Sequence, residues 1–262
     1  LENAPDLRVL VTSREPLKLH EEWQWIVRGL DFPSDAPDQA AEPFSAMQLF
    51  AERVQQIRPD FILAQHLAAV ARICQLVEGY PLGIELAAAL VSIMPLPEIA
   101  DEIANGIDVL ATTMGDIPDR HRSLRVVFDS SWERLRSQEK LVMARLSIFR
   151  GGFDWSAAQA IAQSTRHDLA GLIGKSMLSL NPSGRYAIHE LLRQYAEACL
   201  ENSSAVAHDH ARYFAEFVYA RQEGLMGGAQ KETLNALNGE IENLRVAWRW
   251  AVENADTVLL QR

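Results

Sequence analysis

The sequence predicts a mainly α-helical chain that also carries one short β-hairpin and one isolated apolar strand. Apolar residues recur at three- and four-residue steps through most of residues 44–254, which is typical of helices buried on one face. Two short apolar runs flank the turn sequence NPSG at 181–184, which indicates a hairpin. Residues 9–11, VLV, are short and wholly apolar, as expected of a strand buried in a parallel sheet.

The composition excludes several classes of protein. The chain has 262 residues and a formal net charge of −10, which argues against a general nucleic-acid binder. No apolar run reaches the length of a membrane span, and the N-terminus lacks the features of a signal peptide. Cys74 and Cys199 fall at apolar positions of helical patterns, so we expect buried thiols, neither a disulfide nor a metal framework, and a cytoplasmic location.

The first half of the chain predicts four helices after a linker. Residues 29–43 hold three prolines and are interpreted as a linker or loop. A first helix follows and ends at Arg58, before Pro59, and a second ends near Gly79. Pro81 is suited to the first turn of a third helix. The predicted helices cover about 44–58, 67–77, 81–91 and 97–105.

The second half predicts helices around the hairpin, followed by a long helical pair. Residues 114–120 form a joint, and Ser137 is a candidate cap for a helix that runs to Phe149. Helices followed by a β-hairpin and a further helix are typical of a winged helix. The last two patterns resemble the first unit of a helical solenoid. The predicted helices cover about 124–135, 137–149, 155–164, 166–175, 189–200, 205–223 and 230–254.

Three segments in this order resemble one protein family. They read VLVTSREPL at 9–17, EGYPLGIELAAALV at 78–91 and RYAIHELLRQYA at 185–196. Together they are similar to the STAND class of P-loop ATPases, and most of all to the NB-ARC-like modules of large bacterial regulators with tetratricopeptide repeats. The resemblance extends over essentially the whole chain. It implies these domains: 1–28, the end of a truncated α/β nucleotide-binding domain with its sensor strand; 43–110, a helical lid domain; 118–202, a winged helix; 205–262, the first helices of a TPR-like repeat.

The resemblance also implies a set of nucleotide-contacting residues. Arg14, with Thr12 and Ser13 beside it, matches the sensor arginine that reaches the γ-phosphate of ATP. A planar, permanently charged guanidinium suits that contact, and ligands of parallel sheets bind beyond the carboxyl ends of the strands. Without the resemblance, the same residues predict only a solvated turn.

Two further residues match motifs of the family. Pro81, after Gly79 and Tyr80, matches the proline that packs near the adenine, although Tyr80 stands where the family has leucine. His189 matches the histidine that binds the β-phosphate of ADP and locks the closed state, although Glu190 stands where aspartate is usual. Each also has a plain structural explanation, Pro81 as a helix start and His189 as a helix cap.

The phosphate-binding loop G-x-x-x-x-G-K-[ST] does not occur in the sequence. We therefore expect the chain to begin after the Walker motifs, to contain no catalytic or metal-binding residue, and to bind nucleotide weakly by itself. The intact parent is expected to bind ADP or ATP with Mg²⁺ and to be a slow ATPase. The implied partners are the upstream nucleotide-binding domain, further copies of the parent in a homo-oligomer, and a signal ligand or protein on the repeats, with no membrane.

The resemblance implies a switch that ADP locks and ATP opens, coupling the repeats to oligomerisation. Two alternatives stay open. A winged helix can bind DNA, but the candidate recognition helix, 166–175, reads RHDLAGLIGK and offers few side chains that read bases. The other alternative is a protein-interaction scaffold that does not depend on nucleotide.

Overall fold

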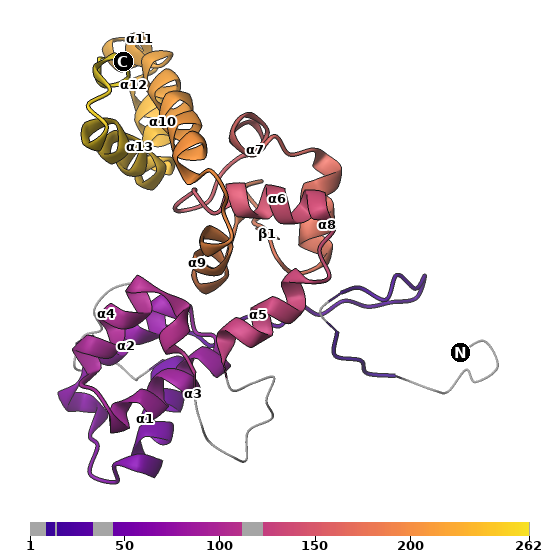
Figure 1. Ribbon diagram of the computed structural model, residues 1–262, viewed down its shortest axis with the longest axis vertical. Helices are drawn as coiled ribbons and strands as arrows, with labels where there is room; N and C mark the ends of the chain where they lie inside the picture. The colour runs from indigo at the N-terminus through magenta and orange to yellow at the C-terminus, as the bar shows by residue number, and fades with distance from the viewer. Residues whose placement is uncertain (1–8, 14, 34–43, 112–122, 262) are drawn as a thin grey trace.

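The structure, a computed structural model, describes residues 9–13, 15–33, 44–111 and 123–261. The predicted mainly helical fold is confirmed, and a single two-stranded sheet is present in these residues. Three helical units follow one another along the long axis of the molecule, and the N-terminal segment projects from them (Figure 1). None of the described helices is long and apolar enough to cross a membrane.

The first unit packs four helices around an apolar centre. Met47, Phe50 and Val54 lie at three- and four-residue steps on one face of its first helix and are fully buried. This helix packs on the third, and the second packs on the fourth. The helices are α1 (Ser45–Ile57), α2 (Leu67–Leu76), α3 (Pro81–Ala89) and α4 (Leu96–Asn105), with short 3₁₀ helices η1 (Leu63–Gln65), η2 (Leu90–Ser92) and η3 (Ile107–Val109).

Residues 29–33, predicted as part of a linker, are instead packed against the first unit. The Leu30 N–H donates to the Gly79 carbonyl at 2.8 Å, and the Gln75 side chain donates to the Pro33 carbonyl at 2.9 Å. Leu30 and Phe32 contact the apolar core. The prolines suggested a loop, but two apolar side chains and satisfied backbone groups hold this segment in place. The rest of the predicted linker, 34–43, lies outside the described residues.

The middle unit consists of five helices and the hairpin. Ser179 pairs with Ala187 and Leu180 with Tyr186 in antiparallel register, and Gly184 takes the positive φ of +81° that the turn needs. The elements are α5 (Leu124–Trp132), α6 (Ser137–Leu146), α7 (Trp155–Ala162), α8 (Arg166–Gly174), β1 (Ser179–Leu180), β2 (Tyr186–Ala187) and α9 (Glu190–Ala198). The predicted joint at 114–120 lies entirely within 112–122, outside the described residues.

The predicted cap of α6 is wrong. Ser137 is the first helical residue, and the preceding Arg136 is the cap. The Arg136 N–H donates to the Glu139 carboxylate at 2.7 Å, so the side chain of the third helical residue satisfies the helix end instead of a serine hydroxyl.

The last unit is built on an antiparallel helix pair, as predicted, but its second pattern is divided. The expected helix over 230–254 is broken at Glu240, directly after Gly239, because glycine weakens a helix and Glu240 is buried in an ion pair with Arg185. Trp248 lies at an apolar position of this helical pattern, but it is 63% exposed. The helices are α10 (Ser203–Tyr219), α11 (Gln222–Met226), α12 (Gln230–Gly239), α13 (Ile241–Glu253) and α14 (Thr257–Leu260).

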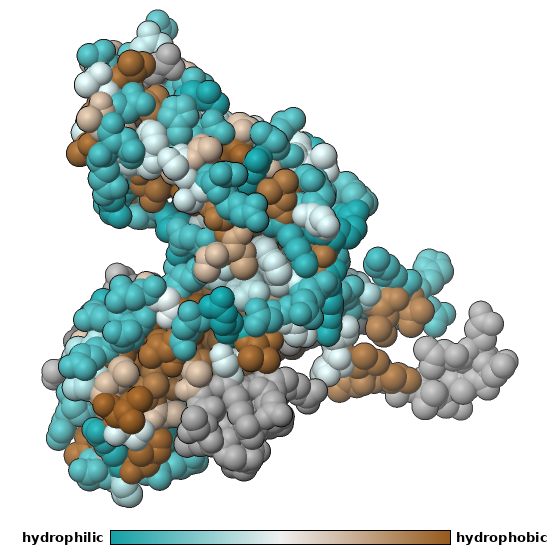
Figure 2. Space-filling view, in the orientation of Figure 1, coloured by the Kyte–Doolittle hydropathy of each residue, from teal (hydrophilic) through white to brown (hydrophobic). Residues whose placement is uncertain are grey.

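The predicted strand at 9–11 is not formed. These residues have no regular secondary structure and are exposed, and Leu10 is 97% exposed. A strand needs a hydrogen-bonded neighbour, and the hairpin is the only sheet in the described residues. Apolar side chains from this segment and from residues 23–27 are visible on the projecting arm in Figure 2, and Trp23 is 98% exposed. We call residues 9–27 the N-terminal arm.

Candidate functional site

The residues predicted from the first motif lie apart from the others. Thr12 and Ser13 are exposed on the N-terminal arm, and the Ser13 hydroxyl donates to the Glu15 carbonyl at 2.7 Å. Arg14 lies outside the described residues. Figure 1 shows the arm pointing away from the helical units, so the described part of the chain does not bring Thr12 to the other predicted residues.

The second motif forms the turn between α2 and α3. Pro81 is the first residue of α3, exposed, where its missing N–H leaves no bond unmade. Gly79 has a φ of +66° and lies so close to Leu30 that a Cβ would meet the Leu30 carbonyl oxygen at 2.0 Å. This glycine therefore allows residues 29–33 to pack against the turn.

The third motif begins α9, and its histidine is the helix cap. The His189 Nδ1 accepts a hydrogen bond from the Leu191 N–H at 3.3 Å, which places the ring proton of the neutral imidazole on Nε2. The Nε2 atom is buried and has no hydrogen-bond partner among the described residues. Burial lowers the pKa of His189, whereas the carboxylates of Glu78 and Glu190 and the nearby Val77 backbone act in the opposite direction.

The second and third motifs meet at a contact between the first and middle units. The Tyr80 ring packs edge-on against His189, with ring centroids 5.8 Å apart. The Glu78 carboxylate accepts a hydrogen bond from the Glu190 N–H at 2.7 Å and lies 3.8 Å from the His189 Nε2. A carboxylate is favoured at a helix N-terminus because the first N–H groups of the helix are otherwise unpaired.

Glu78 was not predicted as a site residue. It occupies an αL conformation with a φ of +46°, unusual for a residue with a side chain. Its sequence position beside the glycine suggested only a helix end. Its role depends on the contact with α9, 112 residues later, which no local pattern records.

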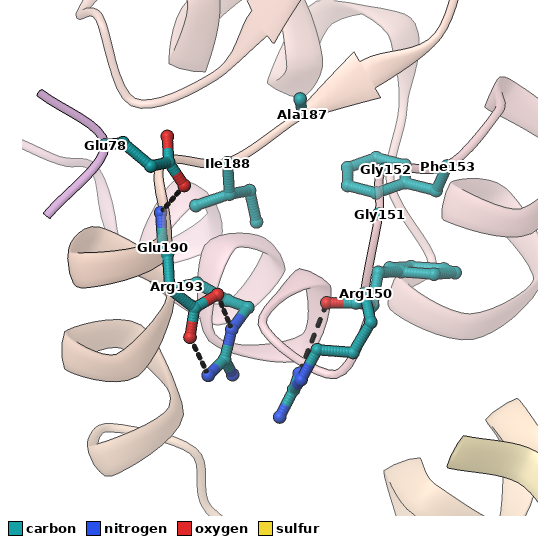
Figure 3. Close-up of a pocket in the computed structure, with 10 residues that line it drawn as sticks. Glu78, Arg150, Gly151, Gly152, Phe153, Ala187, Ile188, Glu190 and Arg193 are labelled. Carbon is teal, nitrogen blue, oxygen red and sulfur yellow. Dashed lines mark hydrogen bonds and ion pairs between the residues drawn. The ribbon is translucent and has the colours of Figure 1, made fainter. Parts of the chain in front are cut away.

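A pocket of about 230 Å³ opens beside this contact, between the first and middle units. Figure 3 shows Glu78 and Glu190 on one side, the turn from Arg150 to Phe153 on the other, and Arg193 from α9 below them. The lining therefore combines two carboxylates, two guanidinium groups and the backbone of two glycines.

The charged groups of this pocket form a connected network. The Arg193 guanidinium donates to Glu190 at 2.7 and 2.8 Å, to Glu197 at 2.6 Å and to the Ser147 carbonyl at 3.1 Å. Arg150 donates to three carbonyls at the end of α6 and to Glu197. Burial opposes ionisation of Glu190, but the bonded Arg193 outweighs it and lowers the carboxyl pKa. These side chains hold α9 against the end of α6.

Basic side chains of α8 and its C-terminal end are engaged within the middle unit. The Lys175 ammonium pairs with the buried Glu139 carboxylate at 2.6 Å, and Arg166 stacks over the Trp155 ring at 4.6 Å. Asp168 is buried and accepts from the Thr165 N–H at 2.9 Å. These contacts leave this helix poorly equipped to read the edges of bases.

No group of three or more His, Cys, Asp or Glu side chains is arranged for metal binding in the part of the chain that the structure describes. Burial raises the pKa of the Cys74 thiol to about 12, as expected of an inert buried cysteine. The contact of Glu78, Tyr80 and His189, with its pocket, is therefore the candidate site. Its groups are suited to polar recognition.

Comparison with known proteins finds relatives in mycobacteria. The chain is 32% identical over 262 residues to a protein of Mycobacterium tuberculosis H37Rv whose provisional name is HTH-type transcriptional regulator, and it is equally similar to a protein of that name in Mycobacterium bovis. These matches cover 95% of this chain and 29% of each relative. An uncharacterised Mycobacterium tuberculosis protein is 30% identical over 225 residues, which are 81% of this chain and 55% of the relative.

No model of a known protein family and no solved structure matches the chain. The chain spans less than a third of the length of the relatives named as regulators. The similarity extends over the first, middle and last units together, because it covers nearly the entire chain.

Proposed function

We propose that this chain is the regulatory portion of a nucleotide-dependent switch of the STAND type within a transcriptional regulator. In this proposal the first unit (43–110) is the helical lid, the middle unit (118–202) the winged helix, and the last unit (205–262) the start of a helical repeat. Residues 1–28 belong to the end of the nucleotide-binding domain. The names of the relatives support a role in transcription regulation.

The contact between the second and third motifs carries this proposal. Two segments more than 100 residues apart in the sequence, each resembling a nucleotide-contacting motif, meet through Glu78, Tyr80 and His189. Such a contact is expected in the closed form of the switch, in which ADP is bound between lid, winged helix and nucleotide domain. The buried His189 Nε2 makes no hydrogen bond of ordinary geometry among the described residues, although the Val77 backbone and the Glu78 carboxylate, 3.8 Å away, are near it. In this proposal it would donate to a phosphate oxygen.

Each predicted residue then has a defined task. His189 would donate a hydrogen bond to the β-phosphate of ADP, and Pro81 would lie on the adenine side of the site. Arg14, with Thr12 beside it, would contact the γ-phosphate of ATP. Bound nucleotide supplies the phosphate charge that these residues recognise, and exchange of ADP for ATP would shift the population from the closed to the open form. Mg²⁺ and the hydrolytic residues would come from the upstream domain.

The exposed N-terminal arm supports an upstream partner domain. Leu10, Trp23, Trp25, Ile26 and Val27 are at least 81% exposed, which is uncommon for a cluster of large apolar side chains. A sheet of the nucleotide-binding domain would cover these side chains and pair the backbone of residues 9–11. The homo-oligomer and the signal ligand or protein on the repeats remain parts of the same proposal.

Direct DNA binding through the winged helix is less well supported. The side chains of Arg166 and Lys175 already contact Trp155 and Glu139, and the chain has a net charge of −10. A relative named for a helix-turn-helix can carry that motif outside the 29% that this chain matches.

Calorimetric titration with ADP and ATP tests the proposal. The titrations compare this chain with a chain extended upstream by about 150 residues, the size of one domain. We expect tight ADP binding only in the extended chain, weakened about tenfold or more by His189→Ala because a charge-assisted hydrogen bond is lost. His208→Ala, a partly exposed histidine on α10, is the control and should bind as the parent does. An extended chain that binds neither nucleotide would leave the scaffold as the better explanation.

A further inference from the structure

A fully buried asparagine connects the last unit to the middle unit. The Asn243 side chain, on α13, is 0% exposed. Its Oδ1 accepts from the Arg150 N–H at 2.8 Å, and its Nδ2 donates to the Gly152 carbonyl at 2.9 Å and to the Glu240 carboxylate at 2.8 Å. One amide group thus satisfies two backbone groups of a turn more than 90 residues earlier in the chain.

A second pair of side chains closes this contact from the hairpin side. Arg185, the residue before β2, forms an ion pair with the buried Glu240 and donates to the same Gly152 carbonyl at 3.1 Å. The Gly152 oxygen is therefore shared between α13 and the hairpin. We call Arg185, Glu240 and Asn243, with the Arg150–Gly152 turn, the clamp.

The clamp continues directly into the segment that carries His189. Phe153 and Tyr186 exchange two backbone hydrogen bonds, at 2.8 and 3.0 Å, and their rings stack with centroids 5.8 Å apart. His189 follows Tyr186 by three residues, and both Gly152 and Ile188 line the pocket beside Glu78. Every step from α13 to His189 is thus either a bond between neighbours in the chain or a hydrogen bond of ordinary length.

We propose that the clamp sets the position of His189 from the last unit, so that a change in the orientation of α13 alters the contact of His189 and Glu190 with Glu78. The proposal rests on the proposed function in that His189 is the nucleotide contact. It adds the route by which an event on the repeats reaches that contact. Two packed elements held by shared buried hydrogen bonds move together, because leaving the shared groups unpaired is unfavourable.

Hydrogen exchange of the nucleotide-free chain tests the coupling. Asn243→Asp keeps the size of the side chain and an acceptor for Arg150, but it replaces the donor to Gly152 and Glu240 with an oxygen that repels both. We expect the amides of Glu190 and Leu191 to exchange at least about fivefold faster, while the amides in the centre of α1 and α2 keep their rates. Glu242→Gln, an exposed neighbour on α13 paired with Arg245, is the matched control and should change neither set.

If Asn243→Asp does not fold, Arg185→Gln and Glu240→Gln allow the same hydrogen-exchange test. Each variant removes one charge of the clamp, Arg185 from the middle unit and Glu240 from the last unit. The double variant completes a double-mutant cycle. We expect each single variant to speed exchange at Glu190, and the double variant to add little, because both remove the same link. The coupling would be contradicted by variants in which the α13 amides exchange faster while the amides of residues 186–191 keep their rates.

The coupling and the proposed function can fail separately. Hydrogen exchange without nucleotide reports the coupling alone, and calorimetry of the extended chain reports nucleotide binding alone. A uniform rise in exchange throughout the chain would show only global destabilisation and would also count against the coupling.

Discussion

The two junctions of the middle unit are built differently. The junction with the first unit contains apolar contacts, with Leu110, Leu124 and Leu191 buried in the core that the two units share. Its polar contacts lie at the rim of a pocket, chiefly the bond from Glu190 to Glu78. The junction with the last unit buries Asn243 and packs Phe149 against Phe214 with ring centroids 6.3 Å apart. In the proposed switch the middle and last units would move as one body, and the junction with the first unit would be the hinge. We call the junction with the last unit the sealed junction, because Asn243 is fully buried there.

The reason for the difference is solvent access. Glu78 and His189 have side chains that are 38% and 32% exposed, so water can replace their contacts when the junction opens. The bonds of Asn243 have no such substitute, because the side chain is sealed from solvent. In the proposed switch, a signal on the last unit would be transmitted through the sealed junction and would open the hinge.

The largest expected effect is at the sealed junction. Asn243→Ala leaves the Arg150 N–H without its acceptor in a buried place, and it removes one of the donors to the Gly152 carbonyl and to Glu240. We expect a loss of about 3 kcal/mol or more in the free energy of unfolding, measured with urea. Glu242→Ala on the same helix should change it by less than about 0.5 kcal/mol. A small loss of stability in Asn243→Ala would show that water reaches this junction, and it would contradict the difference in solvent access between the two junctions.

The next effect is at the turn of the first unit. Gly79→Ala forces a Cβ into the Leu30 carbonyl at a φ of +66°. We expect a loss of about 2 kcal/mol in the free energy of unfolding and faster hydrogen exchange of the Leu30 amide, because residues 29–33 must move away. Gly106→Ala, where a Cβ meets nothing within 4 Å and φ is an extended 166°, is the control. Equal stability of the two variants would contradict this prediction.

A pH titration of stability compares the two junctions directly. Burial lowers the pKa of His210, at the sealed junction, to about 4, while Asn243 opposes and Arg150 assists this shift. Since the folded pKa lies below the unfolded value, stability is complete above about pH 6.5 and is lost as the pH falls towards 4. We expect a loss of about 2 kcal/mol between pH 7 and pH 5.

His210→Gln should remove most of this dependence, and His189→Gln should remove less, because His189 is near two carboxylates that oppose the lowering of its pKa. Urea unfolding at several pH values gives the slopes. A smaller pH dependence of the free energy of unfolding in His189→Gln than in His210→Gln would contradict the burial of His210 at the sealed junction.

The smallest expected effect is at the hinge. Glu78→Ala removes the acceptor of the Glu190 N–H and should lower the free energy of unfolding by about 1 kcal/mol, as the loss of a helix cap does. Exchange of the Glu190 amide should rise about fivefold. Glu85→Gln, which breaks an exposed ion pair with Arg53 inside the first unit, leaves that amide unchanged. An unchanged Glu190 amide in Glu78→Ala would remove this contact from the hinge.

Two residues of the candidate site could be predicted from local patterns, but the contact that brings them together could not. The positions of Pro81 and His189 at helix starts follow from residue chemistry within a few positions of each. Their meeting through Glu78 does not, since it joins segments 112 residues apart. Asn243 did leave a signal, because it falls on the buried side of a helical period that includes Ala247 and Ala251.

The sequence by itself determined most of the helices, the hairpin turn and the helix starts at Pro81 and His189, because these depend on periodicity, proline, glycine and capping residues within a few positions. Tertiary structure alone decided which apolar segments are covered. Residues 29–33 are packed and hydrogen-bonded against the first unit, whereas residues 9–11 have no neighbouring strand among the described residues. It also divided the last long helical pattern at Glu240, since a buried ion pair to another unit outweighs the local preference of one helix to continue.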